Sequence, residues 1–191
     1  GGGTAWMLAL RHPGRVENLV LVGASGWPEE GADADKEPAV FKLLRTPVVG
    51  PLMANLDNTQ LVRSGLEASF VNKALVDDAM VGRYVNMARA PNHRATLLAI
   101  TLGRDGRAHA TREGLAAITA PTLILHGSID AVVPISQAEL LVDKLKMAGV
   151  PYEYDRIEGW PHTMDLEANV NRHCLAKIEE FLDQHLGPPS N

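Results

Sequence analysis

Two short runs of strand-forming, largely apolar residues do most to restrict how this chain can fold. Residues 19–22 read LVLV and residues 122–125 read TLIL, and Gly23 and Gly127 follow them closely. A strand that is apolar at nearly every position is typical of a strand buried on both faces of a parallel sheet. A third strand is predicted near residues 152–157. Because helical patterns separate these strands, the sequence predicts an α/β fold with a parallel sheet and flanking helices.

Three segments around the strands have the residue pattern of helices. They span residues 3–10, 136–147 and 166–186. The sequence HPG at 12–14 ends the first helix, because proline disfavours helical geometry in the residue before it and glycine permits a turn. The last helix is predicted to stop before GPPS, which a helix cannot easily continue through.

The stretch from residue 27 to residue 120 differs from the segments on either side of it. It opens with a polar loop, EEGADADKE, and continues with amphipathic stretches that predict helices. These stretches lie at residues 39–44, 60–70, 73–89 and 92–101. We therefore expect an all-helical cap inserted into the α/β core. The expected boundaries are 1–26 for the first part of the core, 27–120 for the cap and 121–191 for the second part of the core.

Composition and charge exclude several classes of function. The chain of 191 residues is 46% hydrophobic and carries a formal net charge of −5, so it offers no basic field for a nucleic-acid backbone. Its apolar runs are strand-sized, which predicts no membrane span. The single cysteine, Cys174, cannot form an internal disulfide, and this suits a cytoplasmic protein. No histidine has a metal-ligand partner at useful spacing, and we expect neither metal nor cofactor.

Two loops at predicted strand ends carry the residues that could do chemistry. GSIDAVVP follows the second strand and contains Asp130, and EGWPHTMDLE follows the third strand and contains His162. Parallel strands place ligands at their carboxyl ends, so this Asp and this His could touch there. The carboxylate would then fix the tautomer of the imidazole and stabilise its charged form. The alternative is that Asp130 only caps a turn, as we expect of Ser128, while His126 has a structural role on the strand.

These loops, in this order, resemble those of the α/β-hydrolase superfamily. The acid of that family lies in a G-x-x-D-x-x-V-P loop, and its histidine lies in a Gly/His turn that a Glu follows. The corresponding residues here are Gly127, Asp130, Val133 and Pro134 in the first loop, and Gly159, His162 and Glu167 in the second. One difference is that the family usually has Gly and His adjacent, whereas Trp160 and Pro161 stand between them here.

The start of the chain is similar to the helix that follows the family's nucleophile, which sits in a G-x-S-x-G turn. The residues that match this helix are Gly1, Gly2, Ala5, Ala9, Leu10, Pro13, Arg15 and Val16. The resemblance places the nucleophile two positions before Gly1, and it places the donors of the oxyanion hole upstream as well. We therefore expect the chain to be a fragment that holds the second half of the family's domain and is inactive alone.

The resemblance implies a carboxylic ester hydrolase with a Ser-His-Asp triad, in which His162 is the base and Asp130 is the acid. A small apolar ester is the expected substrate, and Trp27, Val132 and Trp160 could line its pocket. Four alternatives remain: a carbon–carbon hydrolase of ring-fission products, an epoxide hydrolase or a haloalkane dehalogenase with Asp as nucleophile, and a non-catalytic binding module. Because the family's epoxide chemistry uses cap tyrosines and only Tyr84 lies in the cap, the epoxide reading is weakened.

Overall fold

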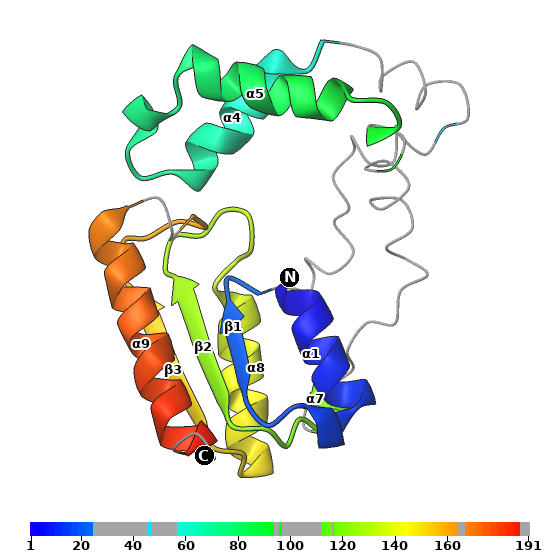
Figure 1. Ribbon diagram of the computed structural model, residues 1–191, viewed down its shortest axis with the longest axis vertical. Coiled ribbons are helices and arrows are strands. Elements are labelled where there is room, and N and C mark those ends of the chain that lie inside the picture. The colour runs from blue at the N-terminus through cyan, green and yellow to red at the C-terminus, as the bar shows by residue number, and fades with distance from the viewer. Residues whose placement is uncertain are drawn as a thin grey trace. The chain divides into compact units, whose positions relative to one another are not determined.

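The computed structural model (Figure 1) describes residues 1–24, 46, 57–93, 96, 112–115, 117–163 and 167–187. Its internal contacts divide the chain into two compact units. Unit 1 comprises Gly1–Pro28 and His109–Asn191, and unit 2 comprises Glu29–Ala108. Unit 1 contains all of the strands described below.

Unit 1 is built on a three-stranded parallel sheet with the strand order β1-β2-β3. The strands are β1 (Leu19–Val22), β2 (Thr122–Gly127) and β3 (Tyr152–Ile157). Thr122 is in register with Leu19 on one side and with Tyr152 on the other. All six residues of β2 are buried, as the predicted apolar run requires of a central strand. The predicted parallel sheet is therefore confirmed.

Helices cover both faces of this sheet (Figure 1). The helices are α1 (Gly2–Arg11), α7 (Arg112–Leu115), α8 (Ser136–Ala148) and α9 (Ala168–Leu186), and a short 3-10 helix, η1 (Pro13–Arg15), follows α1. Leu21 and Ile124 face the cluster that α1 and α8 complete, whereas Leu123 and Leu125 face Phe181 of α9. Successive side chains of a strand point to opposite faces, so β2 contributes to both cores. The predicted helices at 3–10, 136–147 and 166–186 are all present.

The described residues just before β2 pack with the sheet. Leu115 and Ile118 are fully buried, and together with Ala120 they belong to the same cluster as α1 and α8. The division by contacts ends unit 2 at Ala108, whereas the expected cap ends at residue 120. The physical reason is that these apolar side chains bury their surface against α8. The amphipathic pattern of the sequence does not indicate in which of the two units such side chains pack.

The described part of unit 2 is helical. It contains α4 (Thr59–Ser69), the 3-10 helix η2 (Lys73–Leu75) and α5 (Asp78–Arg89). These elements share an apolar cluster made of Leu66, Phe70, Val76, Val81 and Val85. The amphipathic stretch at 73–89 is divided between η2 and α5, because Asp77 begins α5 by accepting the backbone N–H of Met80 at 2.7 Å. The helix predicted at 39–44 and most of the one at 92–101 lie outside the described residues.

Candidate active site

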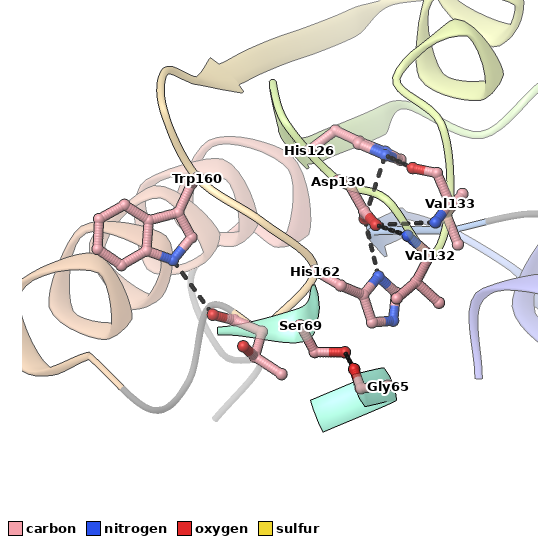
Figure 2. A network of polar contacts seen from close by, with 9 residues as sticks. Gly65, Ser69, His126, Asp130, Val132, Val133, Trp160 and His162 are labelled. Carbon is pink, nitrogen blue, oxygen red and sulfur yellow. Dashed lines mark hydrogen bonds and ion pairs between the residues drawn. The ribbon is translucent and has the colours of Figure 1, made fainter. Parts of the chain in front are cut away.

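Asp130 lies in the loop that follows β2 and is held by the backbone of its own loop. Its Oδ1 atom accepts hydrogen bonds from the backbone N–H groups of Val132 and Val133, each at 2.8 Å. The Asp130 side chain has no exposed surface. Two fixed donors on one oxygen leave the other oxygen, Oδ2, directed at a neighbouring group (Figure 2). Asp130 therefore does more than cap a turn.

His162 supplies that neighbouring group. It lies in the loop after β3, and its Nδ1 atom is 2.8 Å from Asp130 Oδ2. Because the carboxylate oxygen accepts, Nδ1 donates, and the lone pair of the neutral ring is then on Nε2. The side chain of His162 is 34% exposed, so the ring can be reached while its partner is shielded. The arrangement gives an oriented imidazole that can take up a proton at Nε2.

Two glycines allow the strand-end loops to approach so closely. A Cβ atom at position 127 would overlap the carbonyl oxygen of Trp160 and would lie 2.6 Å from that of Pro161. Gly23, at the end of β1, has φ +52°, and a Cβ there would lie 3.2 Å from Cε1 of His162. The absence of side chains at Gly127 and Gly23 therefore makes room for the histidine loop.

Ser128 joins the acid loop to the histidine loop. Its hydroxyl donates to Oε1 of Glu158 at 3.1 Å and accepts the backbone N–H of Gly159 at 2.8 Å. Backbone bonds run beside it: the N–H of Ser128 donates to Ile157 O, and that of Ile129 to Trp160 O, each at 3.0 Å. The interpretation of Ser128 as a turn residue is therefore incomplete, because its partners lie 30 and 31 residues further along the chain and sequence spacing could not reveal them.

Of the three residues expected to line a pocket, the structure describes two, and it places these two in different surroundings. Val132 lies next to the pair: its backbone N–H is bonded to Asp130, and the residue is 52% exposed. Trp160 packs in the apolar cluster of β2 and α9, and its indole N–H donates to Thr163 O at 3.1 Å. In Figure 2 this indole points away from the Asp130–His162 pair. Trp27 lies outside the described residues.

A second histidine contacts the same carboxylate. His126 of β2 is 1% exposed, and its Nε2 atom is 2.9 Å from Val133 O and 3.5 Å from Asp130 Oδ2. Sequence reasoning gave it a structural role only. The feature of the sequence that could have revealed this contact is a polar ring in a strand that is otherwise almost entirely apolar.

The described ranges contain no group of three or more His, Cys, Asp or Glu side chains arranged to hold a metal ion. Within the same ranges, no helix has both the length and the apolarity needed to cross a membrane.

A buried aspartate bonded to a histidine at the carboxyl edge of a parallel sheet is an arrangement that a nucleophilic hydrolase can use as its acid and base. The sequence profile of the alpha/beta hydrolase fold family matches residues 1–167, and the chain belongs to that family.

Two curated relatives are similar in sequence to part of this chain. A 2-hydroxymuconate semialdehyde hydrolase from a Pseudomonas species is 31% identical over 153 residues, which cover 78% of this chain and 49% of the relative. A monoacylglycerol lipase from Mycolicibacterium smegmatis is 29% identical over 145 residues, covering 76% of this chain and 46% of the lipase. The chain thus spans about half the length of these relatives.

Solved structures show the same fold. A meta-cleavage product hydrolase from Pseudomonas fluorescens superposes with a TM-score of 0.71 and is 22% identical in sequence. The match covers 96% of this chain and 62% of that structure. This likeness confirms the α/β-hydrolase fold that the sequence predicted.

Proposed function

We propose that Asp130 and His162 are the acid and base of a hydrolase that acts on small, apolar carboxylic esters. The observation that carries this proposal is the 2.8 Å hydrogen bond between Asp130 Oδ2 and His162 Nδ1, with two backbone N–H groups fixing the other carboxylate oxygen. A histidine held in this way has the tautomer that general-base catalysis requires.

The proposed reaction needs a nucleophile within reach of Nε2 of His162. The similarity of residues 1–16 to the helix after the family's G-x-S-x-G turn supports a nucleophile two positions before Gly1, and we propose that it is a serine. His162 takes the hydroxyl proton as the serine oxygen bonds to the ester carbonyl carbon, and it returns this proton to the alcohol that leaves. Water, deprotonated by the same Nε2, then releases the carboxylic acid and regenerates the serine.

Val132 is the side chain that supports an apolar substrate. It is 52% exposed, and its own backbone N–H is bonded to the catalytic acid, so its place beside the pair is fixed. An exposed branched apolar side chain at that position can contact an acyl or alcohol group. We assign Trp160 a packing role, since its ring joins the cluster beneath α9.

A second candidate reaction is the hydrolysis of a carbon–carbon bond in a ring-fission product. The observation that favours it is the 31% identity with the 2-hydroxymuconate semialdehyde hydrolase over 78% of this chain. The same acid and base can serve both reactions, so the site geometry does not separate them. Comparing kcat/KM for a short-chain ester and for a ring-fission dienoate distinguishes the two.

The deciding experiment uses the protein at its natural length and a chromogenic short-chain ester. His162→Ala should lower kcat by about 10⁴-fold or more, because the base is lost. The matched control is His173→Ala, which removes a His–Asp pair away from the proposed site, between Nε2 of His173 on α9 and Oδ2 of Asp155 on β3 at 2.5 Å, and should leave kcat unchanged. Full activity in His162→Ala would overturn the proposal.

A fluorophosphonate probe tests the nucleophile separately. Such a probe attaches to an activated serine and not to an aspartate, so labelling that disappears in His162→Ala supports the ester hydrolase. Ester turnover without labelling would contradict the serine assignment and redirect the search to the epoxide and halide reactions. Absence of both labelling and turnover would favour the non-catalytic binding module.

A further inference from the structure

We propose that His126 is a positioning residue of this site, which holds the Asp130 carboxylate in place for His162. This inference rests on the proposed function, because it concerns the acid of the same pair. The proposed role requires the Nε2–H tautomer of His126, which can be tested without any substrate.

The tautomer of His126 follows from its contact with a carbonyl group. Nε2 lies 2.9 Å from Val133 O, and a carbonyl oxygen only accepts hydrogen bonds. Nε2 must therefore carry a hydrogen and donate it. The same edge of the ring lies 3.5 Å from Asp130 Oδ2, so its positive N–H end faces the oxygen that also accepts His162 (Figure 2).

His126 and Asp130 together fix both ends of one residue. The N–H of Val133 donates to Asp130 Oδ1 at 2.8 Å, and the C=O of Val133 accepts from His126 at 2.9 Å. If the second bond were absent, the backbone of Val133 could move and carry its N–H group away from Oδ1. The carboxylate would then lose its fixed orientation, and Oδ2 would no longer point at His162 Nδ1.

Burial makes a role in packing alone a poor explanation of His126. The ring is 1% exposed and lies between Leu125 and Gly127 in a fully buried strand. Placing a polar ring there costs free energy that only its hydrogen bonds offset, whereas an apolar side chain would fill the space without that cost. The donor at Nε2 is therefore the property that distinguishes histidine at this position.

The first measurement is made on the unaltered protein at its natural length. Two-bond ¹H–¹⁵N NMR correlations of the imidazole rings distinguish the Nε2–H tautomer from the Nδ1–H tautomer. We expect His126 to be the Nε2–H form and His162 the Nδ1–H form. A His126 ring in the Nδ1–H form would overturn the proposal, whether or not any variant folds.

The second measurement compares two variants with a matched control. His126→Leu removes the donor, and His126→Gln keeps an N–H near the position of Nε2. Thr122→Val removes another buried bond of β2, from Thr122 Oγ1 to Ala120 O at 2.8 Å, at the opposite end of the strand. The readouts are the Nδ1–H proton resonance of His162, which its bond to the carboxylate shifts downfield, and kcat for the ester.

We expect His126→Leu to shift the His162 resonance upfield and to lower kcat by about 100-fold, which is what a small misplacement of a catalytic group costs. His126→Gln should restore most of both, and Thr122→Val should change neither. A resonance that is unchanged in His126→Leu, or lost equally in His126→Gln, would overturn the proposal. If the unaltered protein shows no ester turnover, the function proposed above fails, while the tautomer and the resonance still decide the role of His126.

Discussion

At the scale of single residues, Asp130 combines three hydrogen-bonded contacts on two oxygen atoms. Oδ1 is occupied by the N–H groups of Val132 and Val133, and Oδ2 is occupied by His162. All of these partners donate, which suits a group that only accepts. Any replacement that introduces a donor on the His162 side would reverse the direction of that bond.

Asp130→Asn makes this reversal and keeps the shape of the side chain. Its amide oxygen can still accept the two backbone donors, so its Nδ2–H would face His162 and force the hydrogen of the ring onto Nε2. We expect kcat to fall by about 10⁴-fold, as the triad logic implies, with little change in the free energy of unfolding. Steady-state kinetics and denaturant unfolding of the natural-length protein measure the two quantities. Unchanged kcat would exclude Asp130 as the acid.

Gly127→Ala tests the close approach of the two loops. The added methyl group would overlap the Trp160 carbonyl, so the histidine loop would have to move away from β2. We expect a loss of about 1–3 kcal/mol in the free energy of unfolding, together with lower kcat, since overpacking forces the backbone to shift. Gly82→Ala in α5 is the control: nothing lies within 4 Å of its Cβ position, and it should be neutral or stabilising. Equal stability of the two variants would contradict the close approach.

Asp130 and His162 were predictable because each lies in a strand-end loop with recognisable spacing. His126 and Ser128 were given only structural or turn roles, since their partners are set by tertiary contacts. The hydroxyl of Ser128 meets Glu158 and Gly159 from another loop. The ring of His126 meets a backbone carbonyl that could belong to any residue nearby. Patterns of side chains along the sequence carry no information on such contacts.

At the scale of elements, apolar runs predicted the strands well, and amphipathic stretches predicted the bounds of the described helices of unit 2 less well. The runs at 19–22 and 122–125 became β1 and the start of β2. The central strand β2 is fully buried and needs an apolar side chain at almost every position, whereas Val20 of β1 is partly buried and Val22 is exposed. The stretch over 73–89 instead divides into η2 and α5. A local hydrogen bond from an N-cap can outweigh helical periodicity over a few residues.

Asp77→Ala should therefore destabilise the start of α5. The Asp77 carboxylate accepts the Met80 N–H at 2.7 Å, and loss of such a cap costs about 1 kcal/mol. We expect faster hydrogen exchange of the Met80 amide in Asp77→Ala. Asp77→Asn keeps an accepting oxygen and should exchange nearly as slowly as the unaltered protein. Identical exchange in the alanine variant would show that the cap contributes nothing.

At the scale of the whole molecule, Cys174 links the titration of one thiol to global stability. Burial in the cluster of β2 and α9, reinforced by the negative charge of Asp155, raises the pKa of this thiol above its usual 9.0. The folded protein then keeps a proton that the unfolded chain releases. Stability supplied by this difference is fully present below pH 9 and is lost as the pH rises toward the pKa of the folded state.

We expect the unaltered protein to lose more free energy of unfolding than Cys174→Ala when the pH is raised from about 8 to about 10. Tyr154, whose pKa is also raised, first by burial and then by Glu139, is present in both proteins and cancels in the comparison. Denaturant unfolding at the two pH values gives the difference. An identical loss in both proteins would show that Cys174 does not take part.

The contact between the acid loop and the histidine loop has a consequence for how such a protein can be altered. Loops on a shared scaffold are usually free to vary one at a time. Here Gly127 has no room for a side chain beneath the other loop, and Ser128 exchanges hydrogen bonds with Glu158 and Gly159. A loop transplanted alone from a relative would meet a foreign partner. The two loops therefore depend on each other and must be exchanged together. We expect chimaeric proteins to keep their function only when both loops come from the same parent.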